Sequence, residues 1–126
     1  MKYVVLDTNF IITALRFKID LQGEISRICD FSHTLAVLSG TLDELEKLIN
    51  KGKLFEKRLA KLALTVIKQL KFHMIKAEGH VDDSLAALDP ASHVVATQDR
   101  ELKRRLVSKG FKIIEIRQKK HLMLRG

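Results

Sequence analysis

Short apolar runs alternate along the chain with longer segments in which apolar residues recur every three or four positions. The runs predict strands over 3–6, 34–38, 72–75, 93–96 and 111–116, and the first of these is expected to be buried. The longer segments predict helices after residue 9, from residue 41, over 55–70, from 82 to just before Asp89-Pro90, and over 99–109, where Gly110 ends the last one. This alternation predicts an α/β fold: a three-layer α/β/α arrangement with a mostly parallel central sheet of about five strands.

The length of 126 residues fits a single domain, 1–126, with no room for a second core. A composition of 46% hydrophobic and 30% charged residues excludes a disordered chain. The sequence has no apolar stretch near the ~18 residues of a membrane span. Cys29 is the only cysteine, so no internal disulfide can form, and we expect a buried thiol and a cytoplasmic protein.

The net charge of +8 is concentrated at one end of the chain. The segment 100–126 holds ten Lys and Arg residues against Glu101 and Glu115, and this accounts for the whole excess. A basic segment favours a polyanionic partner such as RNA, and we expect Arg104 and Lys120 to contact phosphates. The alternative is a solvated, lysine-rich surface helix.

Four acidic residues stand where a predicted strand passes into a helix: Asp7, Glu44, Asp82 and Asp99. Each has a structural explanation by itself. Glu44 could complete a capping box that begins at Thr41, and the three aspartates could cap helices. Because strand ends of a parallel sheet meet at one edge, however, the four carboxylates are expected to converge there.

Converging carboxylates repel each other, and a hard divalent cation such as Mg²⁺ removes that conflict. Thr8 and Asn9 add polar groups that could orient a ligand carboxylate or a water molecule; ordinary helix capping is the alternative for this pair. A water bound to such a metal becomes a nucleophile near neutral pH, and the metal charge stabilises phosphoryl oxygens. The four acids therefore predict a metal-dependent phosphodiesterase.

The same residues resemble the motifs of PIN-domain nucleases. The first motif is similar to Val4-Val5-Leu6-Asp7-Thr8-Asn9, and the second to Thr41-Leu42-Asp43-Glu44-Leu45. The third resembles Val81-Asp82-Asp83-Ser84-Leu85-Ala86, and the fourth Val94-Val95-Ala96-Thr97-Gln98-Asp99. Asp83 competes with Asp82, which stands three residues before Leu85 as the family pattern requires, and Asp43 competes with Glu44.

This resemblance implies a PIN-like fold and a Mg²⁺- or Mn²⁺-dependent endoribonuclease, with Asp7, Glu44, Asp82 and Asp99 as catalytic and metal-binding residues. The segment 95–120 is similar to the branch that contains the small-subunit rRNA-processing endonuclease, and short members of this branch are grouped with VapC-type toxins. The resemblance implies single-stranded RNA or rRNA as substrate, a homodimer, and an antitoxin or ribosome-assembly factor as partner. The alternative is an RNA-binding PIN scaffold that has lost catalysis.

Overall fold

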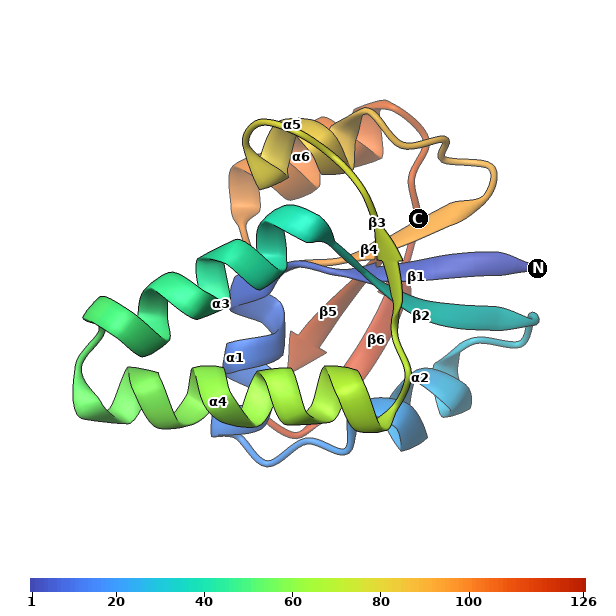
Figure 1. Cartoon of the computed structure of the whole chain (residues 1–126). Helices are drawn as coiled ribbons and strands as arrows, with labels where there is room; N and C mark the ends of the chain where they lie inside the picture. The colour runs from blue at the N-terminus through green and yellow to red at the C-terminus, as the bar shows by residue number, and fades with distance from the viewer.

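The computed structural model describes all residues 1–126 as a sheet flanked by helices (Figure 1). The strands are β1 (Lys2–Leu6), β2 (His33–Leu38), β3 (His73–Ile75), β4 (His93–Ala96), β5 (Ile113–Arg117) and β6 (His121–Arg125). The helices are α1 (Thr8–Arg16), α2 (Leu21–Ile28), α3 (Ser39–Lys51), α4 (Leu54–Gln69), α5 (Val81–Ala86) and α6 (Arg100–Ser108). The predicted α/β class and mostly parallel sheet are confirmed.

The sheet has the order β3-β2-β1-β4-β5-β6. Its first five strands are parallel, and β6 pairs antiparallel with β5. The chain moves from β1 toward β2 and β3, then returns to the other side of β1 for β4 and β5. The carboxyl ends of β1 and β4 therefore flank the point where the direction of winding changes, which is where open α/β sheets bind ligands.

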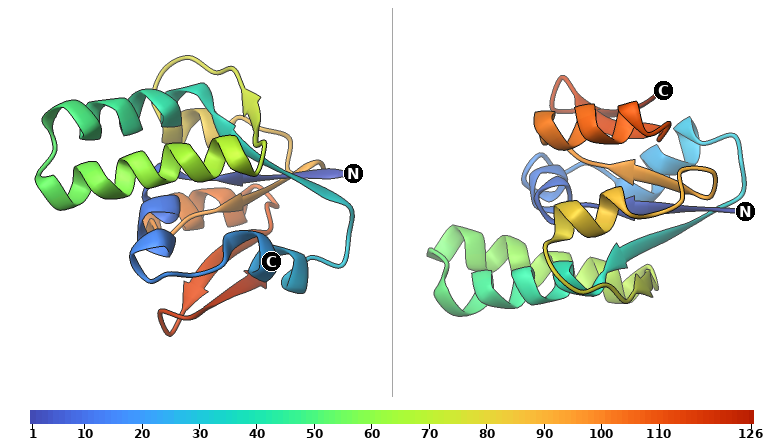
Figure 2. Two further views of the ribbon diagram at one scale, coloured as in Figure 1. Left: turned by 60° about the horizontal axis from the view of Figure 1, so that its bottom comes forward. Right: turned by 90° about the horizontal axis from the view of Figure 1, so that it is seen from above.

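Alternating side chains of each strand enter two separate cores. Val4 and Leu6 of β1 pack in the core shared with α1, α2 and α4, whereas Val5 packs against α5 and α6. Figure 1 shows these helix groups on opposite faces of the sheet. Both views of Figure 2 show α3 and α4 as a pair that extends beyond the sheet. Two covered faces explain why the strands are continuously apolar rather than alternating.

The sheet has six strands rather than about five, because the sequence pattern does not predict β6. The helix α2 is not predicted either. β6 has only three consecutive apolar residues, and α2 mixes apolar residues with polar and charged ones, so neither shows a clear apolar pattern. Tertiary packing nevertheless buries side chains of both elements: Leu122 of β6 is 2% exposed and Ile25 of α2 is 0% exposed. No helix has the length and apolar character needed to cross a membrane.

The helix after β2 begins at Ser39, two residues earlier than predicted. Leu38 is its N-cap and provides no side-chain hydrogen bond, so the expected capping box between Thr41 and Glu44 is wrong. Glu44 consequently lies in the second turn of α3 rather than the first. The cap interpretation of Asp82 is also wrong, because His80 is the N-cap of α5.

The basic segment 100–126 is an integral part of the fold rather than a solvated helix alone. It forms α6, β5 and β6, and Gly110 follows α6 with a φ of 89°, a conformation that favours glycine. A tight turn joins β5 to β6, with Gln118 and Lys119 at φ 54° and 58°. Because β5 is parallel to β1 and β4, this basic turn lies at the edge that carries their carboxyl ends.

Candidate active site

Asp7 stands directly after β1 and is the buried member of the acidic group, at 6% exposed. Its carboxylate caps α1 by accepting the backbone N–H of Thr8 at 2.8 Å. Its other oxygen accepts the Thr97 hydroxyl at 2.9 Å. Burial, together with the carboxylates of Asp82 and Glu44, raises the pKa of Asp7 to about 6 despite these hydrogen bonds.

Glu44 reaches this site from the second turn of α3. The Thr8 hydroxyl donates to Glu44 Oε1 at 2.5 Å, and a 3.1 Å hydrogen bond joins the hydroxyls of Thr8 and Thr41. Both threonines are buried, whereas Glu44 is exposed, so the hydrogen bond between Thr8 and Glu44 lies at the boundary between core and solvent. Thr8 thus contacts Glu44, one of the predicted site carboxylates, whereas Asn9 is exposed and lines the neighbouring cleft.

Asp82 and Asp83 are adjacent on α5 but have different surroundings. Asp83 points to Arg105 of α6, with 2.7 Å between Oδ1 and Nη1, and this ion pair lowers its pKa. Partial desolvation and then the carboxylates of Asp99, Glu44 and Asp83 raise the pKa of Asp82. Asp82 is therefore the aspartate of α5 that faces the other acids, and Asp83 is a surface ion-pair partner.

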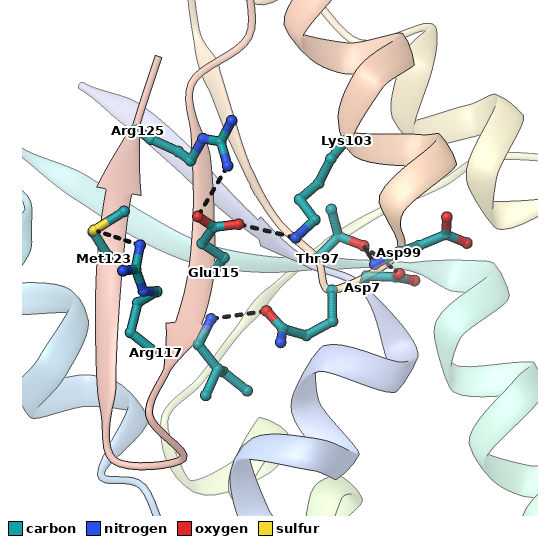
Figure 3. Close-up of polar contacts among 10 residues, drawn as sticks. Asp7, Thr97, Asp99, Lys103, Glu115, Arg117, Met123 and Arg125 are labelled. Atoms are coloured by element: carbon teal, nitrogen blue, oxygen red, sulfur yellow. Dashed lines mark hydrogen bonds and ion pairs between the residues drawn. The ribbon is translucent and has the colours of Figure 1, made fainter.

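Asp99 approaches from the start of α6, as the N-cap whose Oδ1 accepts the N–H of Leu102 at 3.0 Å. Thr97 connects it to Asp7: its hydroxyl donates to Asp7 and accepts the N–H of Asp99 at 3.2 Å (Figure 3). The predicted cap role of Asp99 is confirmed. The same residue also contributes its charge to the acidic group.

The four acids thus come from β1, α3, α5 and α6 and lie close enough to affect one another's ionisation. No lysine or arginine forms an ion pair with any of them. No three of these side chains lie close enough together to ligate a single ion directly. Such a group of uncompensated carboxylates, with Asp7 buried and the others toward solvent, suits a hard cation that keeps part of its water shell, as Mg²⁺ commonly does in proteins.

A cleft of about 490 Å³ opens beside the acids between α1 and α3. Its charged and polar lining consists of Thr8, Asn9, Glu44, Lys47, Lys51 and, from the start of α4, Glu56. Glu44, Lys47 and Lys51 share one face of α3 because they are spaced three and four residues apart. Positive charge therefore begins one helical turn from Glu44, and the two lysines outnumber Glu56 in that part of the lining.

Two threonines contribute to the site in ways that the sequence did not reveal. In the sequence, Thr97 follows an apolar strand motif and Thr41 stands at a predicted helix cap, so neither indicates a role at the acids. Both are 0% exposed. A polar residue next to a predicted buried segment was the available signal, because a buried hydroxyl must find a hydrogen-bond partner.

Comparison with known proteins agrees with this arrangement. Residues 4–119 match the model of the family described as PIN like domain. The chain is similar to Ribonuclease VapC4 of Methanocaldococcus jannaschii, with 34% identity over all of this chain and 98% of that protein. It is also similar to Ribonuclease VapC9 of Archaeoglobus fulgidus, with 28% identity over 98% and 90% of the two chains.

Among solved structures, the PIN domain endonuclease Utp24 superposes with a TM-score of 0.80 at 25% identity. The match covers 98% of this chain and 90% of the Utp24 chain. The family match, the sequence similarity and the shared fold each extend over nearly the whole length of the chain. The chain belongs to the PIN-like domain family.

Proposed function

We propose that this protein is an endoribonuclease that hydrolyses phosphodiester bonds of single-stranded RNA with the help of Mg²⁺ or Mn²⁺. The observation that carries the proposal is the group of four mutually repelling carboxylates at the change of winding direction, with no cation of the protein paired to them. The names of the two ribonucleases and of the Utp24 endonuclease support the same reaction class.

The donor set fits a divalent metal, because carboxylate oxygens are the ligands that Mg²⁺ and Mn²⁺ prefer. Asp7, Glu44, Asp82 and Asp99 would hold it, in part through water. A bound metal would supply charge that stabilises phosphate oxygens and an acidic, readily ionised water. No serine, cysteine or histidine nucleophile is needed.

The protein's own residues give the site its shape. Thr97 holds Asp7 and the backbone of Asp99 together, and Thr8 holds Glu44. Lys47 and Lys51 in the neighbouring cleft would bind phosphates next to the scissile one. Residues 1–126 would act as one functional domain, since the acids are spread from β1 to α6.

The test uses a fluorescent single-stranded RNA incubated with the protein and Mn²⁺, then with EDTA, and then with the Asp7→Asn variant. We expect cleavage only by the native protein with the metal. Asp30→Asn, which changes an exposed aspartate outside the acidic group, is the matched control and should cleave normally. Cleavage that survives both EDTA and Asp7→Asn would rule out the metal-site mechanism, and binding without cleavage would favour the inactive scaffold.

Two biological roles are consistent with this reaction. Maturation of ribosomal RNA is suggested by the similarity to Utp24, and a VapC-type toxin is suggested by the two archaeal relatives. Growth arrest on expression, relieved by Asp7→Asn, would support the toxin role. The expected homodimer, the antitoxin or ribosome-assembly partner, and the cytoplasmic location stay predictions, and sedimentation of the purified chain tests the first of them.

A further inference from the structure

Glu115 is a buried acid that the proposed reaction does not use. It lies on β5 at 6% exposed, on the face of the sheet that α5 and α6 cover. Its two carboxylate oxygens accept from Lys103 Nζ at 2.9 Å and from Arg125 Nη1 at 3.2 Å (Figure 3). Burial disfavours its charge, but the hydrogen bonds from Lys103 and Arg125, together with their positive charges, outweigh burial and lower the pKa of Glu115.

The two cations that Glu115 holds belong to a basic groove of about 540 Å³, which we define by its lining residues Arg100, Lys103, Arg104, Val107, Ser108 and Arg125. Lys103 and Arg125 come from α6 and β6, so one buried carboxylate fixes cations from two elements. Arg100 and Arg104 form no ion pair. The basic groove therefore keeps excess positive charge after Glu115 has neutralised one cation.

The position of the basic groove connects it to the acidic site. Arg100 directly follows Asp99, and the groove continues along α6 to Ser108, about 12 Å at the usual helical rise. A polyanionic chain bound along the groove would thus reach the acidic group at the start of α6. Val107 is the single apolar lining residue, whereas a groove for a peptide partner would offer apolar anchors.

We propose that the basic groove binds the phosphate backbone of the RNA strand on one side of the cleaved bond, with Glu115 positioning Lys103 and Arg125 for this contact. The identification of the polyanion as RNA rests on the proposed ribonuclease function. The contacts would be to phosphates rather than bases, because the lining offers charge but no aromatic surface for stacking.

The test measures binding of a fluorescent single-stranded RNA to the full chain in EDTA, so that cleavage does not intervene, over a range of KCl concentrations. The double variant Arg100→Gln/Arg104→Gln removes two exposed cations that have no ion-pair partner. The matched control Lys61→Gln/Lys68→Gln removes two exposed cations of α4, on the opposite face of the sheet. Circular dichroism melting verifies that both variants fold.

We expect the groove variant to weaken binding on the order of tenfold and to reduce the slope of log K against log salt by roughly 1.4, about 0.7 for each phosphate that is no longer neutralised. The α4 control should leave the affinity and the slope unchanged. A groove variant that matches the native protein or the control in both quantities would overturn the proposal. Cleavage by the native protein in Mn²⁺ is measured separately. If the native protein cleaves RNA but the groove variant binds normally, only the proposed role of the groove is refuted. If the groove variant binds more weakly but the native protein does not cleave, only the proposed nuclease function is refuted.

Discussion

The hydroxyl of Thr8 donates a 2.5 Å hydrogen bond to Glu44, although the two residues lie 36 positions apart in the chain. The same threonine gives its backbone N–H to Asp7. One residue at the start of α1 therefore orients two of the four acids, one through its main chain and one through its side chain. Loss of a side chain that orients a metal-binding carboxylate typically costs about 10–100-fold in metal affinity or activity.

Thr8→Val keeps the shape of this side chain but removes the hydrogen bond to Glu44. We expect cleavage of single-stranded RNA in Mn²⁺ to fall about 10–100-fold, with a stability loss of about 1 kcal/mol. Thr13→Val, at a half-buried position of α1 without a side-chain hydrogen bond, should change cleavage little. Equal cleavage by the Thr8→Val and Thr13→Val variants would show that Glu44 does not depend on Thr8.

Asp82 and Asp83 provide a comparison of neighbouring residues with the same charge. Asp82→Asn should lower the cleavage rate at least about 100-fold, because Asp82 faces Asp99 and Glu44. Asp83→Asn removes only an exposed ion pair with Arg105 and should change the rate less than about twofold. Measured rates in the opposite order would assign the third acidic position to Asp83.

The raised pKa of Asp7 predicts a stability change with a definite sign. The folded state holds the Asp7 proton up to about pH 6, whereas the unfolded chain releases it near 3.8. The stabilising contribution of protonated Asp7 to the free energy of unfolding is therefore fully present below pH 3.8 and is lost as the pH rises through about 6. Asp7→Asn avoids this loss, because asparagine does not ionise.

Urea unfolding in EDTA measures this effect. At about pH 7.5 we expect Asp7→Asn to be more stable than the native protein by about 1–3 kcal/mol, and the gain should shrink toward about pH 4. The comparison between variant and native protein at each pH cancels the titration of other groups. A destabilised variant at high pH, or a difference that does not vary with pH, would contradict the prediction.

Glu24 and Arg27 of α2 protect the outer edge of β6. Glu24 Oε1 accepts the N–H of Leu122 at 2.9 Å, and Arg27 Nη2 donates to the Leu122 carbonyl at 3.1 Å. Glu24→Ala leaves that buried N–H without a partner, so we expect a loss of about 1–2 kcal/mol and faster hydrogen exchange at Leu122. Glu46→Ala, an exposed glutamate of α3 without a partner, is the control.

Acid should have the same effect as this substitution. The hydrogen bonds from Arg27 and from Leu122 lower the pKa of Glu24 to about 2. Its stabilising contribution is therefore complete above its usual pKa of 4.5 and disappears as the pH falls toward 2. Hydrogen exchange at Leu122 that is insensitive to Glu24→Ala would show that the edge is protected by other contacts.

The sequence by itself determined the strands β1 to β5, the mostly parallel sheet, and the arrival of the four acids at one edge. Apolar runs such as Val4–Leu6 are long enough to report burial, and the carboxyl ends of parallel strands always meet at the same edge. These properties depend only on local pattern and on general rules of α/β topology.

Only the tertiary structure decided which polar groups meet. Thr97 contacts Asp7 across 90 residues because β4 lies beside β1. Glu115 contacts Lys103 and Arg125 because α6 packs on the face of β5 and β6 pairs with its edge. The choice between Asp82 and Asp83 likewise depends on where Arg105 lies. Hydrophobic periodicity records whether a side chain is buried, but a hydrogen bond between distant residues depends on the order of the strands, which local pattern does not encode.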